Sequence, residues 1–368
     1  MIDGQFTLGV EEEYQIVHPE TRELRSYVSQ LMEEGGKSIL RERVRQELHQ
    51  SMVEVGTTIC RDVGEVRDQL LEMRRELDRL ARLGGLRIVA AGTHPFSDWR
   101  GQEITDADRY HTIVNDMQDL ARANLIFGLH VHVGIKDKQV AVALANQVRY
   151  FLPHLLALSC SSPFWLGRKT GLMSNRCHIF KRFPRTGIPD EFESWEQLES
   201  FTKLLVKTRC IDTGKKIWWD VRAHYLYDTV EVRICDMPTS MEDTVALVAL
   251  VQALMAKLYL MYKRNTAWRT YARSLIEENK WRAQRYGTDA RMIDFGMMAE
   301  RPFPELADEL VEFVAEASDT LGTTDGLQRI RHMARAGTSA HRQLEVFEQT
   351  RDARAVVDWL IQETMSGV

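Results

Sequence analysis

Short segments in which apolar side chains alternate with Glu, His and Arg constrain the fold of this chain most strongly. In "GLHVHVGI" every second residue is apolar, so His130 and His132 share the other face of a strand. In "TVEVRIC" the same alternation places Glu231 and Arg233 on one face. A period of two is typical of strands that bury one face. It predicts an antiparallel sheet whose second face is polar.

The first such segment, "LGVEEEYQIV", carries three consecutive glutamates. Strand geometry places Glu11, Glu13 and Gln15 on one face, and Glu12 and Tyr14 on the opposite face. The segment therefore presents a pair of carboxylates rather than a triplet. Glu12 is predicted to be incidental.

Two further segments add polar faces. In "QELHQSMVEVGTT", Glu54 lies on the face opposite to its two valine neighbours, and Glu47 precedes it in the chain. In "WWDVRAH", Arg222 shares a face with Asp220 and His224. Each segment taken singly fits a strand with one solvent-exposed face. Taken together, the segments carry Glu, His, Arg and Asp where exposed strand faces usually carry Thr, Ser, Lys and Gln.

Helical spacing predicts the rest of the architecture. The stretch "VGEVRDQLLEMRRELDRLARLGG" reads as a long helix that ends at a Gly-Gly pair. Further helices are predicted over 106–123, 138–159 and 195–208, and almost continuously after Pro238, whereas 162–189 reads as a long ordered loop. We expect one α+β domain over 1–368, in which helices flank a curved antiparallel sheet. The strand-rich core covers about 1–238 and the mostly helical part 239–368.

Composition excludes some classes of partner and indicates a compartment. A formal net charge of −5 gives no reason to expect nucleic acid or an anionic membrane. Five scattered cysteines argue for reduced thiols, and the N-terminus lacks the pattern of a signal peptide. Gln252 and Lys257 interrupt the apolar stretch 244–262, which favours a core helix over a membrane span. We therefore expect a cytoplasmic protein.

The polar side chains of these strands converge if the strands belong to one curved sheet. Carboxylates that face one another raise each other's pKa unless cations neutralise them. Carboxylate oxygens combined with one imidazole suit Mg²⁺ or Mn²⁺ better than structural Zn²⁺. The predicted ligands are Glu11, Glu13, Glu54, His130 and Glu231.

Two arginines on the same polar faces indicate that the site binds an anion in addition to metal ions. The guanidinium groups of Arg222 and Arg233 suit an anion that the metals bring with them, such as a phosphate. The sequence holds neither a "GxxxxGK[ST]" nor a "GxGxxG" loop. A nucleotide is therefore not expected in a P-loop or a Rossmann site.

Several stretches in a fixed order resemble a known family. They are "GVEEEYQIV", "SMVEVGT", "GLHVHVG", "SPFWLGRKTGL", "PRTGIP", "WWDVRAH…TVEVR" and "ENKWRAQRYG". Together they resemble the glutamate–cysteine ligase type 2 family, whose members are ATP-dependent carboxylate–amine ligases with a glutamine-synthetase-like catalytic fold. The stretches run from residue 9 to about residue 287, which is most of the chain.

The resemblance implies a funnel of antiparallel strands that holds divalent cations around ATP. The E-x-E strand of the family falls on the two carboxylates that alternation had selected, and Glu47 becomes a companion of the second acidic element. The implied metal ligands are Glu11, Glu13, Glu47, Glu54, His130 and Glu231.

The reaction implied by the resemblance joins a carboxylate to an amine. The γ-carboxylate of glutamate would be activated as an acyl phosphate and then attacked by an amine such as cysteine. Arg222 and Arg233 would stabilise the transferred phosphoryl group. Arg176 and Arg282 are candidate cofactor-binding residues, and the guanidinium group of each would hold a carboxylate. The expected partners are small molecules, and the oligomeric state stays open, a homodimer included.

Two alternatives belong to other classes. The His130-x-His132 strand is similar to the metal strand of amidohydrolases, which would make the protein a metal-dependent hydrolase. That strand normally opens its barrel, whereas here it follows several predicted helices and strands. The other alternative is a non-catalytic nucleotide- or metal-binding protein on the same fold.

Overall fold

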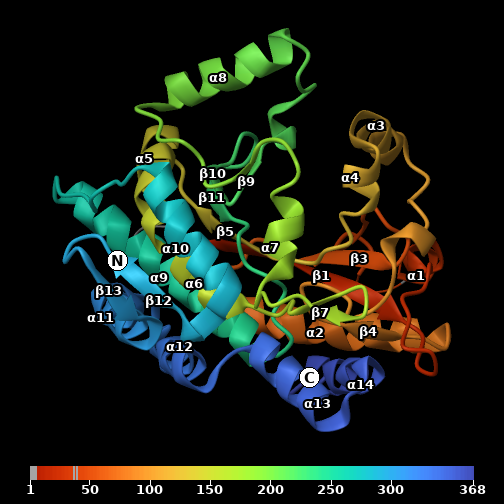
Figure 1. Ribbon diagram of the computed structural model, residues 1–368. Coiled ribbons are helices and arrows are strands. Elements are labelled where there is room, and N and C mark those ends of the chain that lie inside the picture. The colour runs from red at the N-terminus through yellow and green to blue at the C-terminus, as the bar shows by residue number, and fades with distance from the viewer. Residues whose placement is uncertain (1–5, 36–37, 39) are drawn as a thin grey trace.

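The polar-faced segments do form one antiparallel sheet in the computed structural model, which describes residues 6–35, 38 and 40–368 (Figure 1). The strands follow the order β10-β11-β5-β1-β3-β2, and β4 also pairs with β1. Every pairing in this sheet is antiparallel, as alternation predicted. The strands are β1 (Leu8–Val17), β2 (Val44–Gln46), β3 (Met52–Gly56), β4 (Arg87–Val89), β5 (Leu129–Gly134), β10 (Val221–Ala223) and β11 (Thr229–Val232).

The register of the central strands brings the polar residues of distant segments together. In the pairing of β1 with β5, Glu11 lies opposite His130. In the pairing of β1 with β3, Glu13 lies opposite Glu54. Directly opposed residues stand close enough for their side chains to interact. The register therefore builds one polar surface from three strands that are far apart in the sequence.

The opposite face of the sheet is apolar and covered by helices. Val10, Val131 and Val232 are almost completely buried there. The helices that pack against this layer include α2 (Val63–Leu83) on β1 and β4, α5 (Lys138–Val148) on β10 and β11, α9 (Met241–Lys263) on β5 and α14 (Ala353–Thr364) on β4. Since helices occupy the apolar face, the polar face stays available for a site.

Helix α9 contains the apolar stretch 244–262. The helix is long and apolar enough to cross a membrane, yet 72% of its most apolar 18-residue stretch is buried inside the fold. Gln252 within it donates a hydrogen bond to the carbonyl of Phe6 at 2.8 Å. This burial is what a core helix requires, as the sequence predicted.

Glu12 corrects one prediction. It points to the helical face of β1, where it is fully buried and pairs with the fully buried Arg74 of α2 at 2.5 Å. The hydroxyl of Tyr14 also donates to Glu12, and Arg74 donates to the carbonyls of Thr239 and Thr364. Alternation had assigned Glu12 to the correct face, but the prediction that it is incidental was wrong. A carboxylate on a helix-covered face must be paired, because burial of a lone charge is too costly.

The remaining elements mostly follow the helical predictions, with two differences. The predicted loop 162–189 holds short elements, and the C-terminal part contains the hairpin of β12 and β13 in addition to helices. The short elements of the loop are β6 (Phe164–Trp165), β7 (Arg168–Lys169), α7 (Asn175–Phe180) and β8 (Thr186–Gly187). The other elements are α1 (Val28–Gly35), α3 (Asp108–Met117), α4 (Asp119–Arg122), α6 (Leu152–Ser159), α8 (Trp195–Lys207), β9 (Trp218–Trp219), α10 (Arg273–Tyr286), β12 (Arg291–Asp294), β13 (Ala299–Pro302), α11 (Phe303–Leu321), α12 (Thr324–Ala336), α13 (Ser339–Thr350) and α14 (Ala353–Thr364).

One continuous cluster of buried apolar residues runs from Phe6 to Ile361 and joins the sheet to the C-terminal helices. A smaller apolar cluster lies apart from it, around α3, α4 and Phe183. It adjoins the polar face of the sheet and forms one wall of the site described next. The division of the chain into domains stays a prediction.

Candidate active site

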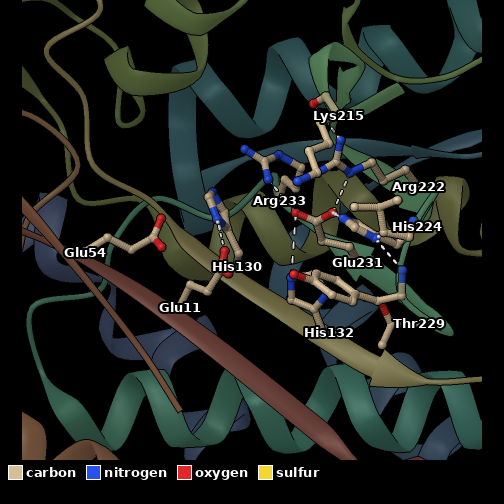
Figure 2. A network of polar contacts seen from close by, with 12 residues as sticks. Glu11, Glu54, His130, His132, Lys215, Arg222, His224, Thr229, Glu231 and Arg233 are labelled. Carbon is tan, nitrogen blue, oxygen red and sulfur yellow. Dashed lines mark hydrogen bonds and ion pairs between the residues drawn. The ribbon is translucent and has the colours of Figure 1, made fainter. Parts of the chain in front are cut away.

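The polar face of the sheet carries a first group of possible metal ligands. Glu11 of β1, Glu54 of β3 and His130 of β5 offer ligand atoms that all lie within 4.8 Å of one another. The Nδ1 atom of His130 lies 3.1 Å from a carboxylate oxygen of Glu11. Figure 2 shows this group on one side of the site. Three strands thus supply one ligand each, as the sequence predicted for these residues.

A second group shares Glu11 with the first. It adds His132 of β5 and Glu231 of β11, again within 4.8 Å of one another. Nε2 of His132 lies 3.8 Å from Glu231, and its Nδ1 lies 3.1 Å from the hydroxyl of Thr229. His132 was not among the predicted ligands, although alternation had placed it beside His130. Neither group of described residues contains both histidines.

Glu13 and Glu47 lie beside these two groups rather than in them. The carboxylate of Glu13 accepts a hydrogen bond from the backbone N–H of Gly128 at 2.5 Å and lies 4.0 Å from Nε2 of His130. Glu47 follows β2 and lines the same cavities as Glu13. Both carboxylates therefore reach the site, at its edge.

A cation that the sequence did not identify bridges two of the carboxylates. Arg45 of β2 lies 3.1 Å from Glu11 and 3.2 Å from Glu54, and about half of its side chain is exposed. Its segment, "RERVRQ", is typical of a charged surface strand. Only the pairing of β2 with β3, in which Arg45 lies opposite Glu54, places it at the site.

The charges of the site shift the pKa of its carboxylates in opposite directions. Burial by itself would raise the pKa of Glu231, but Arg233, Arg222 and His132 bring it well below its usual range. Burial also acts to raise the pKa of Glu11, but His130 lowers it to about 2. Burial and the charges of Glu11, Glu47 and Glu13 raise the pKa of Glu54 well above its usual range. Burial and the charge of Glu13 raise the pKa of Glu47 to about 7.

Site carboxylates that repel one another in this way are suited to binding cations. Around Glu47 and Glu54, burial and repulsion outweigh the charges of Arg109 and Arg45, whereas at Glu231 two arginines and His132 outweigh burial.

The two predicted catalytic arginines meet at Glu231 (Figure 2). Arg222 of β10 pairs with Glu231 at 2.5 Å, and Arg233 pairs with its other carboxylate oxygen. Arg222 also donates to the carbonyls of Ile217 and Lys215. Both guanidinium groups are thus fixed at the polar face, next to the second ligand group.

The structure places the other two predicted arginines differently. Arg176 of α7 is 3% exposed and lines the smaller of the two cavities at the site. Arg282 of α10 instead pairs with Glu278 at 3.2 Å and with Glu300 at 2.8 Å. Arg282 is therefore not brought to the predicted ligands, because it belongs to the packing of α10 against the hairpin of β12 and β13.

Two cavities adjoin the ligand groups. The larger, of about 410 Å³, is lined by Glu11, Glu54, Arg109, Lys215 and Lys216, among others. The smaller, of about 130 Å³, is lined by Arg176 and Phe180 of α7, among others. Residues lining both are Glu13, Glu47, Tyr110, Ile113, His130, Trp218 and Arg233.

Curated relatives match the chain over nearly its whole length. A protein of Sorangium cellulosum named "Putative glutamate--cysteine ligase 2" is 63% identical over 100% of this chain and 98% of its own length. A protein of the same name from Solibacter usitatus is 52% identical over 98% of this chain and 94% of its own length.

Two solved structures share the fold. The glutamate–cysteine ligase of Francisella tularensis in complex with AMP superposes with a TM-score of 0.72 at 11% identity, over 98% of this chain and 89% of that one. A bifunctional glutathione synthetase from Pasteurella multocida gives a TM-score of 0.69 at 14% identity, over 99% of this chain and 52% of that one. These likenesses confirm the predicted glutamine-synthetase-like fold.

The family model described as "Glutamate-cysteine ligase family 2(GCS2)" matches residues 7–358, so the range includes both ligand groups, both cavities and the C-terminal helices. Together with the relatives, this match confirms the resemblance seen in the sequence: the chain belongs to glutamate–cysteine ligase family 2.

Proposed function

We propose that the protein is an ATP-dependent carboxylate–amine ligase, with glutamate as the carboxylate substrate and an amino acid such as cysteine as the amine. The observation that carries the proposal is the pair of ligand groups that share Glu11, with Arg222 and Arg233 fixed beside them. Carboxylates and arginines on one surface can hold cations and a polyphosphate together. Membership of the family supports this reaction class.

The donor set fits a divalent cation. Glu11, Glu54 and His130 would hold one ion, and Glu11, His132 and Glu231 a second. Carboxylate oxygens with few imidazoles suit Mg²⁺ or Mn²⁺, and burial together with three neighbouring carboxylates raises the pKa of Glu54, a cost that a bound cation would relieve. When bound, such ions neutralise phosphate charge during phosphoryl transfer.

The larger cavity suits ATP. Arg109, Lys215 and Lys216 line it together with Arg233, which gives it four cations. Backbone contacts fix this region, since Arg222 donates to the carbonyl of Lys215 at 3.2 Å. Lysine and arginine side chains at such an opening attract phosphate groups and orient them toward the sheet.

The proposed reaction has two steps. A carboxylate oxygen of glutamate attacks the γ-phosphorus of ATP, the bond to the β-phosphate oxygen breaks, and ADP leaves with the electron pair. The neutral amine then attacks the carbonyl carbon of the acyl phosphate, and phosphate leaves as the amide forms and the nitrogen loses a proton. Arg233 and Arg222 act in the first step, where their guanidinium groups stabilise charge on the transferred phosphoryl group.

A cytoplasmic location and small-molecule partners are further parts of the proposal, whereas the oligomeric state stays open, a homodimer included. The location rests on the five scattered cysteines, and the small-molecule partners rest on the reaction class and on the formal net charge of −5. Size-exclusion chromatography with light scattering tests the dimer.

The experiment that tests the reaction class measures ADP formation in the presence of Mg²⁺ across a panel of carboxylates and amines. We expect ADP only when both a carboxylate and an amine are present. His130→Ala should abolish ADP formation, whereas the matched variant His178→Ala should not, because His178 is exposed on the outer side of α7.

Two other outcomes would contradict the proposal. Tightly bound zinc with hydrolysis of an amide or ester would favour the hydrolase alternative, for which both histidines would have to share one ion. Nucleotide binding without any turnover across the panel would favour a non-catalytic binding protein.

A further inference from the structure

The first ligand group is in contact with a cation of the protein itself. One guanidinium nitrogen of Arg45, Nη1, donates to a carboxylate oxygen of Glu11 at 3.1 Å and to a carboxylate oxygen of Glu54 at 3.2 Å. The other carboxylate oxygen of Glu11 lies 3.1 Å from Nδ1 of His130. Arg45 therefore bridges the two carboxylates that would hold a metal ion, and it does so with a single positive charge.

Few contacts hold Arg45 in this place. It belongs to β2, which lies at the end of the sheet and pairs with β3. Among the residues that the structure describes, its guanidinium group has no hydrogen-bond partner besides Glu11 and Glu54. Ion pairs that involve an exposed side chain are weak, because water competes for both partners. The guanidinium group can therefore leave the two carboxylates at little cost.

The two arginines at Glu231 differ from Arg45 in this respect. The side chains of Arg222 and Arg233 are 11% and 14% exposed, whereas 53% of the Arg45 side chain is exposed. Arg222 also donates to two backbone carbonyls, which fix its guanidinium group further. The second ligand group thus has permanent counter-ions, whereas the counter-ion of the first group is free to move.

We infer that Arg45 is an exchangeable counter-ion of the first ligand group. Its guanidinium group leaves Glu11 and Glu54 when a divalent cation binds them, and the side chain then extends into solvent. Arg45 thereby competes with the ion and sets the affinity of the site. The inference rests on the proposed function, in which this group holds a metal ion, and adds a residue that regulates how tightly the ion is bound.

Electrostatic repulsion is the reason for the exchange. A metal ion held by the same carboxylate oxygens would lie close to Nη1 of Arg45, and like charges at short distance repel one another. The two cations therefore do not remain together between Glu11 and Glu54. Because the guanidinium group is tethered beside the site, it competes at a high effective concentration and lowers the affinity for the ion.

The first test measures metal affinity without turnover. Mn²⁺ alone is titrated into the protein in the absence of nucleotide, and free Mn²⁺ is followed by its electron paramagnetic resonance signal. We expect Arg45→Met to bind Mn²⁺ roughly tenfold more tightly than the unmodified protein, because a positive charge next to the ion has been removed. The side chain is half-exposed, so the substitution should preserve the fold.

Two further variants separate a local exchange from a change in net charge. Arg45→Lys keeps the positive charge, so its affinity for Mn²⁺ should lie closer to that of the unmodified protein than to that of Arg45→Met. Arg43→Met removes the same charge nearby in the chain, where Arg43 pairs with Glu72 of α2 at 3.3 Å. Since this pair lies outside the ligand groups, the loss of Arg43 should leave the affinity for Mn²⁺ unchanged.

Thermal unfolding gives an independent readout. In EDTA, Arg45→Met should melt at a lower temperature than the unmodified protein, since Glu11 and Glu54 lose the cation that they share. Mn²⁺ should then raise the melting temperature by more in Arg45→Met than in the unmodified protein, because the stabilisation that a ligand provides grows with its affinity.

Equal affinity of Arg45→Met and the unmodified protein for Mn²⁺ would overturn the inference. Weaker binding by Arg45→Met would also overturn it, since Arg45 would then orient the ligands rather than compete with the ion. An equal gain in affinity in Arg43→Met would assign the effect to net charge and would likewise overturn a local exchange. Failure of all these proteins to bind Mn²⁺ would instead overturn the metal site of the proposed function.

Discussion

Neighbouring glutamates in β1 have opposite roles, because successive side chains of a strand point to opposite faces. Glu11 faces the ligand groups, and Glu12 is fully buried against Arg74. At the scale of single residues, identical side chains at adjacent positions therefore have different roles, one in the site and one in the core. Substitutions at the two positions should have different effects on activity and stability.

Glu54→Gln should stabilise the metal-free protein. Burial and three neighbouring carboxylates raise the pKa of Glu54, so the folded state disfavours the charged form of this carboxylate. We expect the melting temperature in EDTA to rise by about 2 °C, as for a gain of about 1 kcal/mol in a large chain. The increase produced by Mg²⁺ should shrink, and activity should be lost.

Glu11→Gln is the matched comparison for this prediction. His130 lowers the pKa of Glu11 to about 2, so its charge is already stabilised and its removal should not raise the melting temperature in EDTA. A lower melting temperature for Glu54→Gln than for the unmodified protein would contradict the argument from repulsion.

Glu12→Gln should destabilise the protein without acting on the site directly. The substitution leaves Arg74 buried without its counter-ion, and breaking a buried pair in this way costs about 3–5 kcal/mol. Urea unfolding followed by circular dichroism measures the loss. The double variant Glu12→Leu/Arg74→Met should lose less than Glu12→Gln alone, and a loss below about 0.5 kcal/mol for the single variant would exclude a structural role.

At the scale of elements, a buried ion pair links α10 to the strands that carry the arginines. Lys280 lies 2.6 Å from Asp220, and both side chains are buried. The backbone carbonyl of Asp220 accepts a hydrogen bond from the backbone N–H of Arg233 at 2.8 Å. Helix α10 thereby positions the end of β11 at which Arg233 lies.

Lys280→Met should lower both stability and kcat. Asp220 would be left buried and unpaired, at a cost of about 3–5 kcal/mol, and its backbone would no longer hold Arg233 in register. We expect the loss in kcat to exceed any change in KM for ATP. Steady-state kinetics at a temperature well below unfolding separate the two effects.

Arg282→Met on the same helix is the control. Arg282 forms only partly exposed pairs with Glu278 and Glu300, so its loss should change stability by no more than about 1 kcal/mol and leave kcat unchanged. A large decrease in kcat for Arg282→Met would restore it as a candidate ligand-binding residue.

At the scale of the whole molecule, buried neutral histidines couple stability to pH. Burial lowers the pKa of His94 to about 4. Its Nε2–H donates to the carbonyl of Arg22 at 2.8 Å, and its Nδ1 accepts from the backbone N–H of Ser97 at 2.9 Å. Burial likewise lowers the pKa of His49 and of His154 to about 4. The folded state thus keeps these imidazoles neutral where the unfolded chain protonates them.

The free energy of unfolding should fall as the pH drops from about 6.5 to about 4. The unfolded chain binds a proton at His94 below about pH 6.5, and the folded protein does so only near pH 4, so the unfolded state gains relative stability in between. The full effect of one such histidine is about 3 kcal/mol. In His94→Asn the pH dependence should be weaker by about this amount, measured by urea unfolding from neutral to acidic pH.

The exposed His178 provides the comparison, and His178→Asn should keep the pH dependence of the unmodified protein. Equal slopes for His94→Asn and the unmodified protein would show that His94 is protonated in the folded state.

Much of the site was predictable because strand periodicity is a local property. Alternation alone selected Glu11, Glu231 and the two histidines, and it placed Glu12 on the opposite face. The same reasoning could have included His132 among the ligands, since it shares a face with His130. Family resemblance then supplied the funnel of antiparallel strands and the reaction class, whereas the order of the strands came from the structure.

Other features depend on contacts between segments that are distant in the sequence. Arg45 reaches Glu11 only because β2 pairs with the far side of β3, and "RERVRQ" carries no sign of this. Arg282 lies in a stretch typical of the family, but its partner Glu300 on β13 holds it away from the ligands.

The sequence by itself determined which face of each strand is polar and which helix is apolar, because both depend on the spacing of residues along one element. Only the tertiary structure decided that Glu12 has a buried partner and that the ligands form two groups around Glu11. It also decided that Gly128 leaves room for Arg176. Register between strands and packing between elements fix these distances, and no local pattern in the sequence encodes either of them.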